Sequence, residues 1–139
     1  MAYRFTNTEK WTNDGWFIDL PPNEKLLFIY LCETCDIAGF RELSVRQISF
    51  NVGLSEEEIK GALKGLQRGL VYSKDSFVVF VRNFIKHQKN LPLNPKNSVH
   101  IGIINRLTEN LDKFGFTDIN QYFNADGNSK APLKGSQST

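Results

Sequence analysis

The chain has 139 residues, which suits one domain able to bury roughly two-thirds of the surface that the unfolded chain exposes. Apolar residues make up 40% of the sequence and 11 residues are phenylalanine, which argues for a globular core and against a disordered chain. The formal net charge of +2 is too small to select a class of partner.

The sequence carries no sign of export or membrane insertion. No apolar run reaches the ~18 residues of a transmembrane helix. The start, MAYRFTNTEKW, lacks the apolar segment of a signal peptide. Two cysteines without an export signal fit a reducing compartment, so we expect a cytoplasmic protein without a membrane segment.

The charges are unevenly distributed along the chain. No acidic residue occurs between Asp75 and Glu109, and this window holds the basic residues Arg82, Lys86, Lys89, Lys96 and Arg106. A local basic surface attracts polyanions even when the total charge is small.

The first third of the chain predicts one long helix. Residues 3–20 favour an extended stretch followed by one helical turn. Pro21-Pro22 then leads into a helix, because proline is tolerated at the first helical position. Residues 26–31 are apolar on every side, which predicts a buried helix, and residues 37–41 predict a loop or a minimal strand.

Two capping signatures follow in close succession. Ser44 with Gln47 predicts a short helix that ends near Gly53, and Ser55 with Glu58 predicts a second. This second helix is expected to run over 56–68 and to stop at Gly69, as a typical glycine after a helix end.

A hairpin and a further helix complete the predicted domain. Residues 70–72 and 77–81 are β-rich runs around a short turn, and their alternation sets Phe80 and Phe84 opposite Val79 and Val81. After a loop with two prolines, Ser98 is expected to cap a helix that ends at Gly115. Thr117 then caps a short turn through Tyr122 and Phe123.

The predicted order is three helices, a two-stranded wing and a further helix. The expected fold is therefore mainly α with a small β-hairpin: a winged helix-turn-helix with an additional C-terminal helix. We expect a winged-helix domain with its helical extension over 1–123 and a flexible tail or linker over 124–139.

Helix 56–68 has the character of a DNA-reading helix with an acidic start. At 100° per residue, its apolar side chains face the core, while Lys60, Lys64, Gln67 and Arg68 face outward. Acidic residues stabilise a helix start, so they do not exclude DNA from the remaining face. They would nevertheless repel phosphates, so the pattern is compatible with DNA without being diagnostic of it.

A resemblance to a known family adds to this pattern. Residues 43–71, LSVRQISFNVGLSEEEIKGALKGLQRGLV, resemble a general winged-helix pattern. Residues 10–31, KWTNDGWFIDLPPNEKLLFIYL, resemble the beginning of phage-type replication initiators and replisome organisers, which have a DnaD-like N-terminal winged-helix domain. RNFIKHQ at 82–88 is similar to the segment closing their wing, and NPKNSVHIGIINRL to the helix that follows. The similarity covers roughly residues 3–115.

The resemblance implies double-stranded DNA as the ligand and replication initiation as the process. It also implies self-association through the N-terminal part and the wing, so a homodimer is one expected assembly. Family members carry a further C-terminal domain that recruits a helicase or its loader. The chain ends instead in a linker-like stretch, so helicase loading would need a region outside it.

The predicted DNA-contacting residues are Arg46, Gln47, Lys60, Lys64, Gln67, Arg68, Lys74, Lys86 and Lys89. The second capped helix would enter or approach the major groove, the preceding helix would steady the backbone, and the wing tip would reach the adjacent groove. The alternative is a protein-interaction or oligomerisation module of a replication or transcription-regulatory complex, without direct DNA reading. The acidic first turn and the small net charge favour that alternative.

The remaining reactive residues predict no enzyme, no metal and no cofactor. Cys32 and Cys35 end an apolar helix, which is the wrong end of the helix dipole for a reactive thiol, so they are interpreted as packing residues. His87 and His100 lack the paired spacing of zinc ligands. His100 is interpreted as structural, whereas for His87 a phosphate contact and a solvated loop position stay open. No phosphate loop, nucleophile elbow or carboxylate cluster is present.

Overall fold

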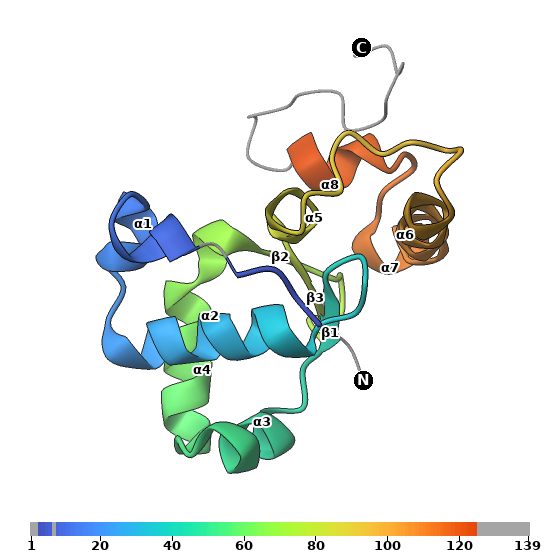
Figure 1. Ribbon diagram of the computed structural model, residues 1–139. Coiled ribbons are helices and arrows are strands. Elements are labelled where there is room, and N and C mark those ends of the chain that lie inside the picture. The colour runs from blue at the N-terminus through green and yellow to red at the C-terminus, as the bar shows by residue number, and fades with distance from the viewer. Residues whose placement is uncertain (1–2, 7, 125–139) are drawn as a thin grey trace.

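The computed structural model describes residues 3–6 and 8–124. Its fold is mixed α+β, with helices packed around a small antiparallel sheet (Figure 1). In chain order, the elements are η1 (Thr8–Trp11), α1 (Gly15–Ile18), α2 (Pro22–Thr34), β1 (Phe40–Glu42), α3 (Val45–Val52), α4 (Glu56–Gly65), η2 (Gln67–Gly69), β2 (Leu70–Tyr72), β3 (Val78–Val81), α5 (Phe84–His87), α6 (Ser98–Glu109), α7 (Leu111–Phe114) and α8 (Asn120–Asn124).

The sheet has three strands rather than the two of a hairpin. The strand order is β1-β3-β2, and both neighbouring pairs are antiparallel. Phe40 of β1 and Val71 of β2 both pair with Phe80 at the centre of β3. The predicted hairpin is thus confirmed, and the minimal strand expected near residue 40 completes the sheet.

The two faces of β3 serve two hydrophobic cores. Val79 and Val81 are buried on one face, together with residues of α1, α2, α3 and α4. Phe80 is buried on the other face with Ile103, Leu107 and Tyr122 of the C-terminal helices. Figure 1 shows α2, α3 and α4 on one side of the sheet and α6, α7 and α8 on the other. The predicted alternation over 79–81 is therefore confirmed.

The placement of Phe84 opposite Val79 was wrong. The strand ends at Val81 and the chain turns into α5 at Phe84, so the strand period does not reach this residue. Phe84 is instead 3% exposed and packs in the same core as Val79.

Helix α2 begins at Pro22, as the two prolines predict. Leu27 and Leu31 are fully buried, but Leu26 is 44% exposed. The prediction of a helix buried on all sides was therefore wrong at Leu26, because one side of α2 faces solvent.

Helices α3 and α4 have the predicted caps. Ser44 accepts a hydrogen bond from the Gln47 backbone, and Gly53 ends α3 with a φ of 86°, in the left-handed region. Ser55 and Glu58 form both bonds of a capping box, of 2.9 and 3.0 Å. The hydrogen bond from the Ser55 backbone N–H holds the pKa of Glu58 below its usual value.

The predicted end of this helix was wrong by several residues. Helix α4 ends at Gly65, and residues 67–69 form the separate 3₁₀ turn η2. The Leu66 N–H bonds to the carbonyls of both Ala62 and Leu63, so the last turn tightens before Gly69 is reached. Gly69 is required for another reason: a Cβ there would lie 2.8 Å from the Trp16 ring.

The C-terminal helices differ from the predicted single helix. Asn97, not Ser98, caps α6 by accepting hydrogen bonds from the Val99 and His100 backbones. The helix breaks at Asn110, so Leu111–Phe114 forms a separate α7 that ends at Gly115, with a φ of 71°. The short turn predicted through Tyr122 is α8. The predicted flexible tail over 124–139 was wrong at Asn124, which ends α8, and the rest of it lies outside the described residues.

Candidate nucleic-acid interface

Helix α4 presents a polar face to solvent. Ile59, Ala62 and Leu66 are at most 3% exposed, so the predicted core face is confirmed. Lys60 and Lys64 are exposed on the opposite side, and Gln67 continues this face from η2. The C-terminal helices do not cover these three side chains.

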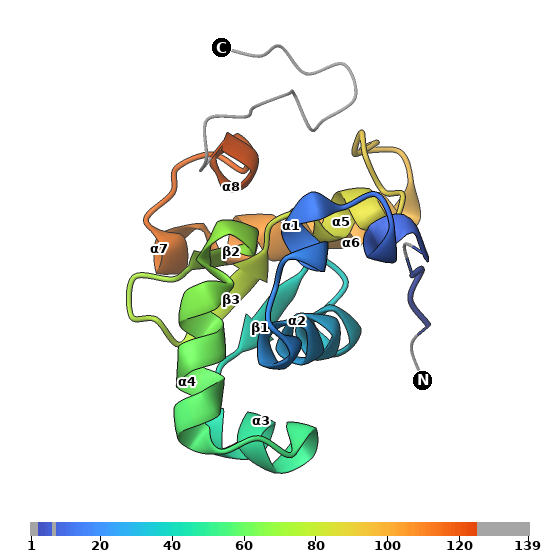
Figure 2. The same ribbon diagram turned by 90° about the vertical axis from the view of Figure 1, so that its left-hand side faces the viewer.

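A groove runs between α4 and the turn that joins β2 to β3. Its polar wall is Lys60, Lys64 and Gln67, and the rest of its lining is Leu43, Val45, Leu63, Tyr72, Ser76 and Phe77. Figure 2 shows this turn beside the upper part of α4. The Tyr72 hydroxyl donates to the Leu63 carbonyl at 3.2 Å and thereby fixes the strand against the helix.

The turn beside the groove is held in one conformation by hydrogen bonds. Asp75 accepts from the Ser73 hydroxyl at 2.7 Å and from the Phe77 backbone at 3.0 Å. The bond from the Phe77 backbone is the main cause of the lowered pKa of Asp75. The Lys74 N–H donates to the Lys113 carbonyl at 2.8 Å, which ties the turn to α7.

Acidic and basic groups are separated along α4. Glu56 and Glu57 are exposed in its first turn, and Glu58 also accepts from the Asn23 amide at 3.3 Å. Lys64 is eight residues beyond Glu56, or ~12 Å along the axis at the usual helical rise. The positive charges of α4 therefore lie after its first turn.

The predicted residues of the preceding helix and the wing lie close to this groove. Arg46 and Gln47 are exposed and follow Val45, whose side chain lines the groove. Lys74 is exposed in the β2–β3 turn, but its aliphatic chain lies against Gly115. Its stem therefore points toward α7.

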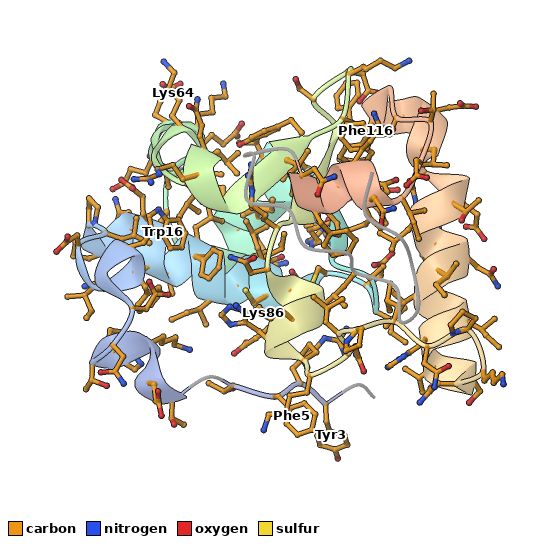
Figure 3. The ribbon with its side chains drawn as sticks, turned by 90° about the horizontal axis from the view of Figure 1, so that it is seen from above. Tyr3, Phe5, Trp16, Lys64, Lys86 and Phe116 are labelled. Atoms are coloured by element: carbon orange, nitrogen blue, oxygen red, sulfur yellow. The ribbon has the colours of Figure 1, made fainter. Side chains whose placement is uncertain are left out.

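The other predicted residues lie elsewhere on the molecule. Arg68 belongs to η2 and lines a separate pocket with His87. Lys86 and Lys89 lie in or just after α5, and the Lys89 ammonium sits 5.9 Å from the centre of the Phe5 ring. Figure 3 shows Lys64 and Phe5 at opposite edges of the molecule, with Lys86 between them. The nine predicted residues thus do not form one face.

Two exposed aromatic residues were not predicted as part of a surface. Phe77 lines the groove and is 66% exposed, and Phe50 on α3 is 87% exposed. The sequence placed Phe77 in a strand, but β3 begins at Val78, because Ser76 has a φ of 65° and turns the chain just before it. The turn over 73–76 was itself predicted, and only the first residue of the strand differs.

The cysteines and His100 occupy structural positions. Burial raises the pKa of both Cys32 and Cys35 to about 12, so neither thiol is activated. His100 accepts from the Asn94 backbone at 2.8 Å, in a structural position as predicted. Within 3–6 and 8–124, no three His, Cys, Asp or Glu residues cluster as metal ligands.

The described part of the chain has no helix with the length and apolarity that a membrane crossing requires. Comparison of the sequence and structure with protein-family models, curated proteins and solved structures found no match.

Proposed function

We propose that the chain is a winged-helix protein that binds duplex DNA through the groove beside α4. The order α2, β1, α3, α4, β2, β3, with the strand order β1-β3-β2, supports the winged-helix assignment. In this reading α3 and α4 are the helix-turn-helix pair, and the β2–β3 hairpin is the wing.

The carrying observation is the exposure of Lys60, Lys64 and Gln67 along one groove wall. Ammonium groups suit phosphate contacts, and a glutamine amide can pair with the edge of an adenine. Gly61 adds room on this helix, since nothing lies within 4 Å of the position that its Cβ would occupy. A backbone phosphate could therefore approach α4 closely.

The proposed contact surface is smaller than the one predicted from the sequence. It keeps Lys60, Lys64 and Gln67 at its centre, with Arg46 and Gln47 at its edge. Lys86 and Lys89 are left out, because they lie on a different part of the surface from Lys64 (Figure 3).

The test is a charge reversal on the groove wall. Fluorescence anisotropy with a short labelled duplex of random sequence is measured at ~50 and ~200 mM salt, where a phosphate-driven binder loses about tenfold or more in affinity. The Lys60→Glu, Lys64→Glu protein is expected to bind at least about tenfold more weakly at the lower salt.

The matched control is Lys86→Glu, Lys96→Glu, which changes the net charge equally at two exposed residues away from the groove. The control is expected to retain most of the affinity. Equal losses in both proteins would mean that only net charge matters, and unchanged binding by the groove variant would refute this assignment of α4.

A protein-docking module is the second candidate function. The exposed rings of Phe50 and Phe77 and the acidic first turn of α4 favour it, because exposed aromatic residues are typical anchors of protein interfaces. Absence of duplex binding at both salt concentrations would favour docking over DNA reading.

Replication initiation is proposed only on the resemblance of residues 10–31, 82–88 and 94–107 to phage-type initiators. A helicase or loader as partner would require a region beyond this chain. A homodimer is likewise proposed from the resemblance alone, and light scattering with and without DNA would test it.

A further inference from the structure

A second pocket is lined by residues of α1, η2 and α5. Its volume is about 460 Å³, within the range of ligand-binding pockets. The residues that line it are Lys10, Asp14, Trp16, Phe28, Arg68, Gly69, Arg82, Asn83 and His87. They come from five different segments, which only the folded chain brings together.

Backbone contacts fix the position of the two arginines. The Arg82 N–H donates to the Gly69 carbonyl at 3.0 Å, which joins the end of η2 to the segment between β3 and α5. Arg68 precedes Gly69, so this bond holds both arginines at the same pocket. The side chain of Arg68 is exposed, whereas that of Arg82 is half-buried.

The charges of the pocket favour an anion. Lys10, Arg68 and Arg82 are cationic side chains, and Asp14 is the one carboxylate among the described lining residues. Asp14 also caps α1 by accepting from the Phe17 backbone at 3.2 Å, so its position is set by the helix. Three cationic side chains and one carboxylate are thus present among the described lining residues.

His87 adds a group whose charge can respond to a ligand. Burial, followed by the charges of Lys86 and Lys10, lowers the pKa of His87, and Asp14 partly opposes this effect. An anion in the pocket would favour the imidazolium and reverse the shift.

An aromatic wall faces these charged groups. Trp16 and Phe28 pack edge to face, with ring centres 5.1 Å apart. Apolar walls exclude water and strengthen the attraction between fixed cations and a bound anion. Arginine side chains in such a setting suit the planar, multidentate recognition of phosphate.

We propose that this pocket is a phosphate-binding site, separate from the groove beside α4. Arg68 and Arg82 bind the phosphate oxygens, with Lys10 and His87 completing the positive side. The phosphate belongs either to a small phosphorylated molecule or to the backbone of a nucleic acid. This site does not depend on DNA binding at the groove.

The first experiment titrates the isotope-labelled protein with inorganic phosphate and with a 5′-mononucleotide, followed by NMR. The Trp16 indole and His87 imidazole signals are expected to shift with saturation, and the pKa of His87 is expected to rise on binding. Sodium chloride at matched ionic strength serves as the control titration. Unchanged signals with both phosphate probes, or equal shifts with chloride, would overturn the proposal.

Variants then locate the site. Arg68→Gln changes an exposed residue, so it tests the pocket even if Arg82→Gln fails to fold. Loss of one charge-assisted bond is expected to weaken phosphate binding about tenfold or more. Lys96→Gln, at an exposed residue that lines neither the groove nor the pocket, should leave phosphate binding unchanged, and the opposite pattern would contradict the assignment.

Duplex DNA distinguishes the two sources of phosphate. If the source is a small molecule, Arg68→Gln leaves duplex affinity unchanged while phosphate binding falls. If the source is the DNA backbone, Arg68→Gln weakens both, and inorganic phosphate competes with the duplex beyond its ionic-strength effect. Loss of duplex affinity without any loss of phosphate binding would refute the pocket.

Discussion

Arg106 of α6 binds Asp36 of the α2–β1 turn across 70 residues of sequence. Its Nε and Nη2 both lie 2.9 Å from Oδ2 of the carboxylate. The other oxygen accepts from the backbone N–H groups of Ala38, Gly39 and Phe40. One carboxylate therefore shapes the turn into β1 and attaches the C-terminal helices to it.

Asp36→Ala is expected to lower the free energy of unfolding by about 2 kcal/mol, because it leaves backbone donors and a guanidinium without their acceptor. Urea denaturation would measure the loss. The control is Glu109→Gln, which removes the more exposed partner of Arg106 and should cost less than about 0.5 kcal/mol. Equal effects of the two variants would show that Asp36 has no special role.

Local signals in the sequence predicted the helix starts at α3 and α4 and the hairpin. Ser44 and Ser55 cap their own helices, and such bonds involve residues three positions apart. The sequence predicted only a loop or a minimal strand over 37–41, because β1 is short and its pairing with β3 joins residues 40 positions apart. The end of α4 was missed, because Gly69 accommodates Trp16 and not a helix end.

Only part of the candidate site was predicted, because only its helical residues follow a local pattern. Helical periodicity correctly predicted that Lys60 and Lys64 are exposed. The same periodicity predicted a helix through Arg68. This residue instead lies in the 3₁₀ turn η2 and lines another pocket. Lys10 and Arg82 join that pocket through tertiary contacts that no local pattern encodes. Phe77 was predicted as the first residue of the second strand, and β3 begins one residue later, at Val78.

Gly61→Ala is expected to stabilise the protein by about 0.5–1 kcal/mol. The position is exposed inside α4, with no atom within 4 Å of the new Cβ, so alanine gains helix propensity without a clash. Thermal unfolding would measure the change. Gly53→Ala is the counterpart: with a φ of 86° it should destabilise instead. A destabilising Gly61→Ala would contradict the open environment described for α4.

The thiols are expected to resist modification in the folded protein. Both pKa values are raised from 9.0 to about 12, so at pH 8 the reactive thiolate is ~100-fold or more scarcer than in the unfolded chain. A chromogenic disulfide reagent should therefore react slowly without urea and rapidly with it. Fast reaction of the native protein would show that the end of α2 is open to solvent.

The same burial predicts alkaline sensitivity. A thiol whose pKa is raised in the folded state supports folding fully below pH 9.0, the value for an unperturbed cysteine, and loses this contribution as the pH rises toward about 12. Cys35→Ala should flatten the fall in the free energy of unfolding above pH 9.0, measured by urea titration. An unchanged slope would mean that Cys35 titrates equally in both states.

His87 predicts a loss of stability on the acid side. Its pKa is lowered from 6.5 in the folded state, so the unfolded chain binds the proton first as the pH falls through 6.5. Stability from this residue is present above pH 6.5 and declines below it. His87→Gln should flatten this decline in urea titrations, and inorganic phosphate should reduce it in the native sequence. A steeper decline in the variant would mean that folding raises the pKa of His87, contrary to this prediction.

The hydrogen bond from Lys74 to the Lys113 carbonyl joins the groove to the opposite half of the molecule. A molecule bound to the β2–β3 turn would hold α7 in place and, through α7, the core that contains Phe80 and Tyr122. Occupation of the groove should therefore slow amide exchange at Ile103 and Leu107, which no groove ligand touches. Ligand binding in the groove would thus be detected as slower amide exchange on the other side of the sheet.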